Sequence, residues 1–277
     1  MSTNTETLLS TPTVVVRDAI QTVGAPATER APAAATALVF AYRGVFVRHI
    51  GSEIVVAEPN QVLFFNAGQA HRIAYPLVEG AAHLLLEIEQ TLLGEIAPQK
   101  IVRATAPLRF APARLRIDPR AQALVAMLRY SLREEIAEPL EAESLALTLA
   151  QRALGPRTTH QAGASASMQK LVDRVKLALT ADLARRWTLA DIAAEVGGSP
   201  VYLTQAFGQV EGVPLYRYQL RLRLAKALDL MGDCDDLSAL GLELGFSSHS
   251  HFSAAFKQAY GRTPTEFRQS VLQREDR

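Results

Sequence analysis

The C-terminal part of the chain contains an internal repeat, which limits the possible folds more than any other feature of the sequence. Each copy consists of a short amphipathic stretch, a glycine, and a serine that opens a second amphipathic stretch. The first copy begins at Leu189 with its turn at Gly197, and the second begins at Leu237 with its turn at Gly245. Glycine permits the positive φ of a tight turn, and serine caps the helix that follows. The repeat therefore predicts two helix-turn-helix units.

The apolar residues of the repeat indicate how each unit packs. Ala193 and Gly241 stand where two steeply crossing helices need a very small residue. Phe207 and Phe256 are large residues at equivalent places, where they hold each second helix against its own core. The opposite face of each second helix is then free to contact another molecule.

The free faces carry short or amide side chains, which reach base edges in a major groove without long charged stems. The base-facing candidates are Val201, Tyr202, Thr204, Gln205, His249, Ser250 and Ser253. Hydroxyl groups at the helix starts and nearby basic side chains suit phosphate oxygens. The phosphate-contact candidates are Ser199, Arg217, Arg221, Ser248 and Lys257.

One amphipathic helix is predicted between the two units, from Pro214 to Met231. At 1.5 Å per residue its length is roughly 27 Å, which is comparable with the ~34 Å between successive major-groove faces of DNA. The helix can therefore act as a spacer between two recognition helices.

Charge and composition exclude several classes of protein. The 277 residues carry a formal net charge of +1, so a nucleic-acid partner has to be argued from the motif and not from the overall charge. A single cysteine, Cys234, excludes an internal disulfide framework and a cysteine-cluster zinc site. No apolar run approaches the roughly 18 residues of a membrane helix, and the start of the chain lacks signal-peptide features. We therefore expect a cytoplasmic protein without a membrane partner.

Residues 11–117 show short β-rich runs separated by turn residues, which is typical of an antiparallel sandwich or barrel. The expected strands are Val14–Val16, Leu38–Tyr42, Val45–Val47, Ile54–Ala57, Val62–Phe65, Arg72–Tyr75 and His83–Ile88. The first ten residues are expected to be disordered, and residues 25–37 to form a loop. From Pro119 onwards the apolar spacing is that of two amphipathic helices. Their apolar faces either pack on the barrel or form the seam of a homodimer.

Three segments of the C-terminal part match a known family signature. They are Leu244–Lys257, Tyr260–Arg268 and the linker-helix motif Arg223–Ala227. Through these segments, residues 168–268 resemble the AraC/XylS family of bacterial transcription regulators. The resemblance implies a seven-helix domain in which the helices at 199–209 and 248–258 enter the major groove of DNA.

Some positions depart from that signature. Members of the family often carry longer basic residues where this chain has Gln205 and Ala254, and an aromatic residue where it has His251. Ala254 can make only an apolar contact, for instance with a thymine methyl group. The second unit is therefore expected to position the protein on the DNA backbone more than to read bases.

The sequence as a whole predicts an α+β multidomain protein, with an N-terminal cupin-like β-barrel carrying helices and a C-terminal all-α domain with two helix-turn-helix units. The expected domains are an effector-sensing barrel at 11–118, a helical dimerisation segment at 119–154, a linker at 155–167 and a DNA-binding domain at 168–270. The linker prediction rests on small and polar residues without a hydrophobic period.

The barrel region looks like a degenerate cupin motif, and His49, Glu53 and His71 are weak candidates for a two-histidine, one-carboxylate metal site. Val47 stands where metal-binding cupins have a further histidine, so no metal and no cofactor are expected. The resemblance to the AraC/XylS regulators implies a small-molecule effector inside the barrel. The pocket candidates are Phe40, Tyr42, His49, Phe64 and His71, and the aromatic residues Phe65 and Tyr75 also lie on expected strands.

The leading hypothesis is a one-component transcription regulator and not an enzyme. It would act as a homodimeric activator that binds double-stranded DNA, responds to a small-molecule effector and works with RNA polymerase. Two alternatives stay open: a metal-dependent cupin enzyme with a DNA-binding appendage, and an effector-free DNA-binding adaptor. No Gly-rich phosphate loop, nucleophile elbow or pair of catalytic carboxylates occurs in the sequence, which favours a regulator over an enzyme.

Overall fold

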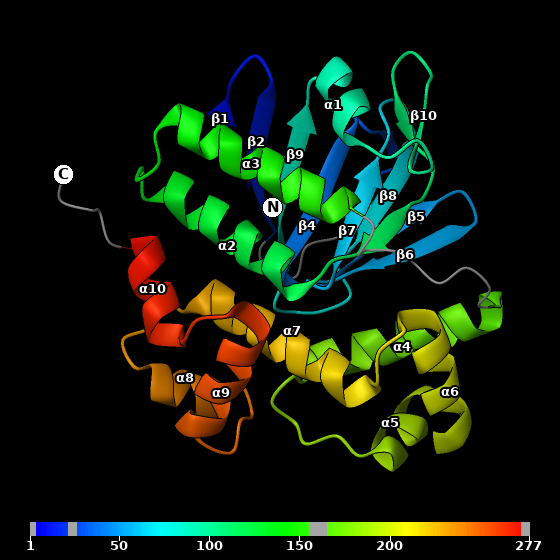
Figure 1. Ribbon diagram of the computed structural model, residues 1–277. Helices are drawn as coiled ribbons and strands as arrows, with labels where there is room; N and C mark the ends of the chain where they lie inside the picture. Colours follow the sequence, from blue (N-terminus) through cyan, green and yellow to red (C-terminus); the bar gives the residue numbers. More distant parts are fainter. Residues whose placement is uncertain (1–3, 22–26, 156–164, 273–277) are drawn as a thin grey trace. The chain divides into compact units, whose positions relative to one another are not determined.

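The computed structural model describes residues 4–21, 27–155 and 165–272 (Figure 1). Contacts between residues divide the chain into two compact units, residues 1–158 with 265–277 and residues 159–264. The first unit contains all the described strands, and the second is helical.

The first unit is built from two antiparallel sheets and a short hairpin. The larger sheet has the strand order β1-β2-β9-β4-β7-β12, and the smaller sheet has the order β3-β8-β5-β6. The larger sheet comprises β1 (Asn4–Ser10), β2 (Val14–Gln21), β9 (Ala81–Ile88), β4 (Ala37–Gly44), β7 (Gln61–Phe65) and β12 (Arg114–Arg116). The smaller sheet comprises β3 (Ala31–Pro32), β8 (Ala70–Ala74), β5 (Phe46–Ile50) and β6 (Glu53–Ala57), and the hairpin comprises β10 (Val102–Arg103) and β11 (Arg109–Phe110). Each strand expected from the sequence is present, with its ends shifted by up to three residues except in β2, which runs five residues beyond the expected end.

Side chains between the two sheets form an apolar interior. Val39, Leu63 and Phe65 of the larger sheet belong to the same cluster as Phe46 and Val55 of the smaller sheet. None of these five side chains is more than 6% exposed. Facing sheets with this alternation of inward side chains give the barrel-like sandwich that the sequence predicts.

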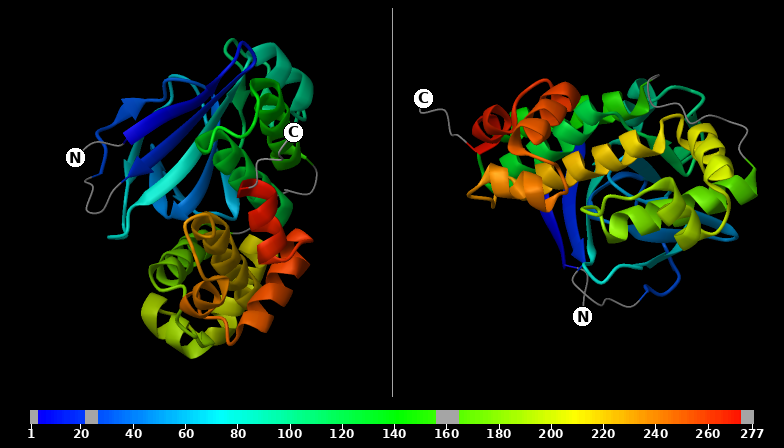
Figure 2. Two further views of the ribbon diagram at one scale, coloured as in Figure 1. Left: turned by 90° about the vertical axis from the view of Figure 1, so that its left-hand side faces the viewer. Right: turned by 90° about the horizontal axis from the view of Figure 1, so that it is seen from below.

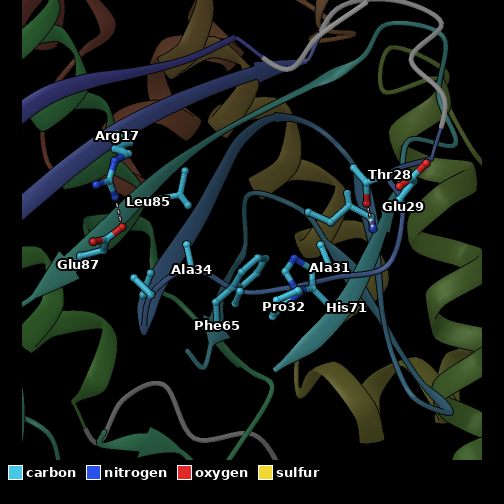
Figure 3. Close-up of a pocket in the computed structure, with 14 residues that line it drawn as sticks. Arg17, Thr28, Glu29, Ala31, Pro32, Ala34, Phe65, His71, Leu85 and Glu87 are labelled. Atoms are coloured by element: carbon cyan, nitrogen blue, oxygen red, sulfur yellow. Dashed lines mark hydrogen bonds and ion pairs between the residues drawn. The ribbon is translucent and has the colours of Figure 1, made fainter. Parts of the chain in front are cut away.

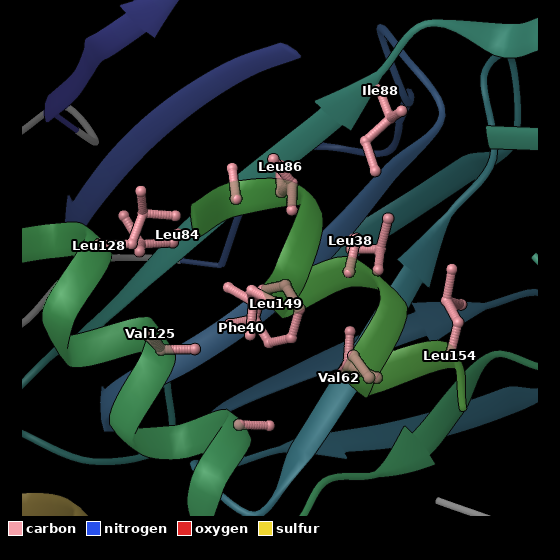
Figure 4. Close-up of a cluster of buried hydrophobic side chains, with 14 of the residues drawn as sticks. Leu38, Phe40, Val62, Leu84, Leu86, Ile88, Val125, Leu128, Leu149 and Leu154 are labelled. Carbon is pink, nitrogen blue, oxygen red and sulfur yellow. The ribbon is translucent and has the colours of Figure 1, made fainter. Parts of the chain in front are cut away.

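The other face of the larger sheet is covered by α2 (Pro119–Arg133) and α3 (Pro139–Leu154), as Figures 1 and 4 show. Val125 of α2 and Leu149 of α3 pack in one cluster with Phe40 of the sheet. The apolar faces of both helices are therefore buried against the strands, which confirms the first of the two alternatives for them. A short helix, α1 (Gln90–Ile96), follows β9.

A buried polar network joins α2 to the sheet. Asp18 of β2 is buried, with 1% of its surface exposed. Its carboxylate accepts hydrogen bonds from the Tyr42 hydroxyl at 2.7 Å and from Arg133 Nε at 2.8 Å. A buried carboxylate is stable only when its oxygens have such partners. Tyr42 and Arg133 thereby hold β4 and α2 to β2.

The N-terminal residues differ from the prediction of disorder. Asn4–Ser10 form β1, the antiparallel partner of β2, and bury Leu9. The pairing with β2 supplies hydrogen-bond partners for the backbone N–H and C=O groups of this segment. Its mostly polar side chains had given no indication of a strand. Residues 1–3 of that prediction lie outside the described residues, as do 156–164 of the expected linker.

The helical unit contains two helix pairs joined by a long helix (Figures 1 and 2). The helices of this unit are α4 (Ala166–Ala181), α5 (Leu189–Val196), α6 (Pro200–Glu211), α7 (Leu215–Leu230), α8 (Leu237–Glu243) and α9 (His249–Tyr260). The last described helix, α10 (Pro264–Leu272), is counted with the first unit from residue 265 onwards. Val175, Phe207 and Tyr218, from α4, α6 and α7, are fully buried in one cluster. In the described part of the chain, no helix has the length and apolar composition needed to cross a membrane.

His83 makes the stability of the first unit depend on pH. Its ring is buried against Phe46, and burial lowers its pKa to about 4. In the unfolded chain the His83 ring is protonated near pH 6.5, whereas in the folded protein it stays neutral until about pH 4. The contribution of this residue to the free energy of unfolding is therefore fully present above pH 6.5 and is lost as the pH falls towards 4. We expect the free energy of unfolding to fall by about 2–3 kcal/mol between pH 7.5 and 4.5 from this residue alone.

Urea unfolding followed by circular dichroism at the two pH values measures this loss. His83→Gln should flatten the pH dependence, whereas His249→Gln, which changes an exposed histidine, should leave it as in the wild type. Equal pH dependence in wild type and His83→Gln would contradict the assignment.

Candidate functional site

The first helix-turn-helix unit is formed by α5 and α6. Thr188 caps α5 in a complete capping box with Asp191, because each side chain binds the backbone N–H of the other residue, at 3.1 and 2.9 Å. Gly197 has a φ of 73°, which the turn requires. Ser199 Oγ then accepts a hydrogen bond from the Tyr202 N–H at 3.2 Å and starts α6. These are the start and turn signals that the sequence predicts.

The outer face of α6 carries all four of its base-facing candidates. Val201 is 68% exposed and Tyr202 is 40% exposed, and Thr204 and Gln205 are also exposed. The Thr204 hydroxyl donates to the Pro200 carbonyl at 2.9 Å, so only its lone pairs are left to accept a bond from outside. Gln205 keeps both its amide donors and its carbonyl acceptor accessible, which suits bidentate recognition of a base.

The second unit is formed by α8 and α9. Gly245 has a φ of 82°, and Ser248, not Ser247, caps α9 by accepting from the His251 N–H at 3.1 Å. A Cβ at Gly241 would lie 3.0 Å from Phe252 Cβ. This close crossing of α8 and α9 is why the position takes so small a residue.

The outer face of α9 presents His249 and Ser250 to solvent, while Ser253 is half-buried. His249 and Ser253 are one helical turn apart, and a hydrogen bond of 3.2 Å joins His249 Nε2 to the Ser253 hydroxyl. Lys257 is exposed at the far end of the helix. This face therefore offers few groups for base edges, as the small Ala254 already indicates in the sequence.

The two phosphate candidates on α7 differ in their surroundings. Arg217 is exposed and donates from Nε to the Tyr216 hydroxyl at 3.0 Å. Arg221 is half-buried and interacts with other groups of the protein. Arg217 is therefore the more accessible cation of the two.

Arg223 of α7 links the two helix-turn-helix units, a role that was not predicted from the sequence. Its guanidinium donates to the carbonyls of Leu183 at 2.7 Å, Arg185 at 2.9 Å and Gly245 at 3.0 Å. The first two carbonyls precede α5, and the third lies in the turn between α8 and α9. A Cβ at Gly245 would lie 2.4 Å from the Ala184 carbonyl oxygen, so the two segments are in close contact. The linker-helix motif Arg223–Ala227 was the signal that marked this residue.

The first unit contains a mainly apolar pocket of about 420 Å³ (Figure 3). Its lining comprises the alanine-rich segment 31–37, Phe65, His71, Ile73, Leu85 and the ion pair between Arg17 and Glu87. The rings of Phe65 and His71 meet edge to face at 4.9 Å. Burial, together with the positive charge of Arg48, lowers the pKa of His71, which favours a neutral ring at pH 7.

Only part of the predicted effector contacts line this pocket. His71 does, and so does Phe65, one of the further aromatic residues on the expected strands. Phe40 and Tyr42 belong instead to the cluster under α2 and α3, and Phe64 lies in that cluster and at a second pocket. Because β4 and β7 are buried on both faces, burial alone does not reveal which alternate residues point into the barrel.

The weak metal candidates are not brought together. Arg48 is buried inside the barrel, so its neighbour His49 points to the opposite face of β5. His71 shares the inner face with Ile73, the register partner of Arg48. Among the described residues, no three His, Cys, Asp or Glu side chains are placed to hold a metal ion. His49, Glu53 and His71 therefore do not form the metal site considered from the sequence, and His49 does not line the effector pocket.

Family comparisons agree with the two-part organisation of the chain. Residues 192–270 match a family described as a helix-turn-helix domain, and residues 25–150 match the AraC-like ligand binding domain. The chain belongs to the AraC family. It combines a ligand-binding domain with a helix-turn-helix domain.

Curated relatives in the AraC family are named as regulatory proteins and not as enzymes. The transcriptional activator RhaR of Klebsiella pneumoniae is 31% identical over 107 residues, 38% of each chain. The regulatory protein PocR of Salmonella typhimurium is 30% identical over 105 residues, 38% of this chain and 33% of that one. The probable transcriptional regulator LumQ of Photobacterium leiognathi is 27% identical over 184 residues, 64% of this chain and 71% of that one. The chain thus spans about a third of the length of the first two relatives.

Proposed function

We propose that the protein is a sequence-specific DNA-binding transcription regulator that responds to a small molecule. The observation that carries the proposal is the pair of exposed helix faces, on α6 and α9, that Arg223 and α7 hold in one helical unit. Two recognition helices on one rigid support suit two successive stretches of major groove. A neutral overall charge is compatible with this, because the contacts come from a few local groups.

The proposed contacts follow from accessibility and chemistry. For bases we propose Val201, Tyr202, Thr204, Gln205, His249, Ser250 and Ser253. For phosphates we propose Ser199, Arg217, Arg221, Ser248 and Lys257. Gln205 is the strongest base reader among the four candidates on α6, because its exposed amide presents two donors and an acceptor in the geometry of bidentate base recognition.

The effector would occupy the apolar pocket lined by Phe65 and His71. The alanine-rich wall and Leu85 suit an apolar surface, and the polar groups of Arg17, Glu87 and His71 would orient the molecule. An effector changes DNA binding only if it has different affinities for two states of the protein. An effector-free adaptor would bind DNA with the same affinity whether or not the small molecule is present.

The domain organisation supports this division of roles. We propose a sensing barrel at 11–118, a helical segment at 119–154 that contributes to a homodimer, a linker at 155–167 and a DNA-binding domain at 168–270. The apolar faces of α2 and α3 are already buried on the sheet, so a dimer would use their outward residues, such as Leu140, which is 77% exposed. Activation through RNA polymerase in the cytoplasm completes the proposal.

Selection of duplexes from a randomised DNA pool tests the function. The full-length protein should enrich one asymmetric site with two fixed base clusters about one helical turn apart. The selection is repeated at two salt concentrations, because phosphate contacts alone enrich no sequence. One cluster would mean that the second unit only anchors to the backbone, and no enrichment, with or without extracts of small metabolites, would contradict sequence-specific binding.

Single substitutions separate base reading from phosphate binding on the selected site. Gln205→Ala should lower discrimination at one base pair by about 1–3 kcal/mol, because the amide pairs with one base. Arg217→Ala should weaken binding to all sequences alike and reduce the salt slope by about one. Gel-shift titrations against the site and its single-base variants measure both effects.

Two substitutions in the first unit serve as matched controls. Gln99→Ala and Lys100→Ala remove an exposed amide and an exposed cation far from α6 in the sequence, and neither should change affinity. Equal loss on every sequence for Gln205→Ala and Arg217→Ala would contradict the division of roles.

A further inference from the structure

A second pocket of the first unit differs in character from the apolar effector pocket. Its volume is about 330 Å³, and it adjoins the β10–β11 hairpin, which Figure 1 shows projecting beside the sheets. Its lining includes Glu53, Phe64, Gln69, Arg103, Arg109 and Phe110. No residue lines both pockets.

Two arginines face each other across the hairpin at this pocket. Arg103 and Arg109 are register partners in the β10–β11 pair, so their side chains leave the same face. Both side chains are exposed, and neither guanidinium forms an ion pair or hydrogen bond with the described residues. Like charges directly opposite in an antiparallel pair destabilise it, unless an anion lies between them.

A third guanidinium lies behind the pocket wall. Arg48 is fully buried and donates from Nη1 to the Phe64 carbonyl at 2.7 Å and from Nη2 to Gln69 Oε1 at 3.5 Å, while its Nε has no partner. Burial lowers the pKa of Arg48 to about 10, so it is still charged at pH 7. Among the described residues, no carboxylate lies within ion-pair distance of it, although the charge of Glu53 favours its charged form. Its charge adds to the positive potential of the pocket.

The pocket is held in shape before any ligand binds. The Asn66 side chain donates from Nδ2 to the Phe110 carbonyl at 3.1 Å and accepts from the Phe110 N–H at 2.7 Å, which fixes the hairpin to the end of β7. The rings of Phe64 and Phe110 are buried and stacked with centroids 4.3 Å apart, which keeps this wall of the pocket rigid. A site that is already ordered loses little entropy on binding.

We propose that this pocket binds a small organic molecule that carries an oxyanion group, either a carboxylate or a phosphate. Arg103 and Arg109 hold the oxyanion, because paired guanidinium groups match its oxygens in a bidentate arrangement. The apolar part of the ligand lies against the accessible apolar lining at Ile50, Ala111 and Pro112. Glu53 is the one acidic side chain of the lining, and it is outnumbered by the two lining arginines, Arg103 and Arg109. The site is separate from the effector pocket and does not depend on the proposed DNA binding.

Calorimetric titration of the full-length protein without DNA tests this site. The probes are benzoate and phenyl phosphate, with benzamide as the neutral molecule of the same shape. Both anions should bind at least tenfold more tightly than benzamide, and their relative affinities distinguish a carboxylate site from a phosphate site. The double variant Arg103→Gln/Arg109→Gln should weaken the anions at least tenfold and leave benzamide unchanged.

The double variant Arg72→Gln/Arg120→Gln is the matched control. It removes two exposed arginines of the same unit that do not line this pocket, and it should bind both anions as the wild type does. Equal affinity for benzamide and benzoate, or anion binding that survives loss of Arg103 and Arg109, would overturn the proposal. Because no step uses DNA, these outcomes are independent of the duplex selection.

Discussion

Lys176→Met should lower the free energy of unfolding of the helical unit by about 3–5 kcal/mol, because it leaves a buried carboxylate without its partner. Lys176 of α4 and Glu211 of α6 are both fully buried, with Nζ and Oε1 2.6 Å apart. The ammonium also lies 5.6 Å from the centre of the Tyr218 ring of α7. Removal of one charge from such a site costs far more than removal of an exposed one.

Urea unfolding followed by the fluorescence of Trp187, the single tryptophan of the chain, reports on this unit. The double variant Lys176→Met/Glu211→Leu should regain most of the lost stability, because it removes both buried charges together. Lys170→Met, which changes an exposed lysine of the same helix, should have an effect within about 0.5 kcal/mol. A loss below about 1 kcal/mol for Lys176→Met would show that the pair does not stabilise the packing of α4 on α6.

The helix-turn-helix units could be predicted from the sequence because their signals are local. Gly197 and Gly245 mark turns that need positive φ, and Ser199 opens its helix with a side-chain cap, all within a few residues of one another. The small Gly241 is explained by a contact only eleven positions away, at Phe252. Local signals of this kind do not depend on the rest of the fold.

The effector pocket could be predicted only in part, because β4 is buried on both faces. Val39 points between the sheets and Phe40 points under the helices, yet both are fully buried. A strand with two buried faces shows no alternation of apolar and polar residues, so the sequence does not reveal which residues line the barrel. Phe40 and Tyr42 were proposed as pocket residues, and they do not line the apolar pocket for this reason.

Contacts between distant segments were also missed. The buried pair of Lys176 and Glu211 joins α4 to α6. Arg223 of α7 donates to the carbonyl of Leu183, which precedes α7 in the sequence, and to that of Gly245, which follows it. An isolated lysine or arginine in an amphipathic helix is more often solvated, and only the packing shows otherwise. The sequence carried one hint, the linker-helix motif that begins at Arg223.

Arg223→Ala should reduce affinity for the selected two-cluster DNA site by about tenfold to a hundredfold. In the folded unit its guanidinium donates to carbonyls at Leu183, Arg185 and Gly245 and so fixes the turn of the second helix pair to the segment before the first. Two recognition helices bind DNA more tightly than one only while their relative geometry is held, since the second contact is then intramolecular. Loss of this link frees one helix pair from the other.

Gel-shift titrations against the full site and against a site with one cluster scrambled separate this effect from simple unfolding. Arg223→Ala should keep its affinity for the single cluster and lose most of the advantage of the full site, because α5–α6 and α8–α9 each retain their own caps and turns. Arg223→Lys should behave almost as badly, since an ammonium cannot reproduce the planar fork of donors. Unchanged affinity for the full site in both variants would show that α7 alone fixes the spacing of the two recognition helices.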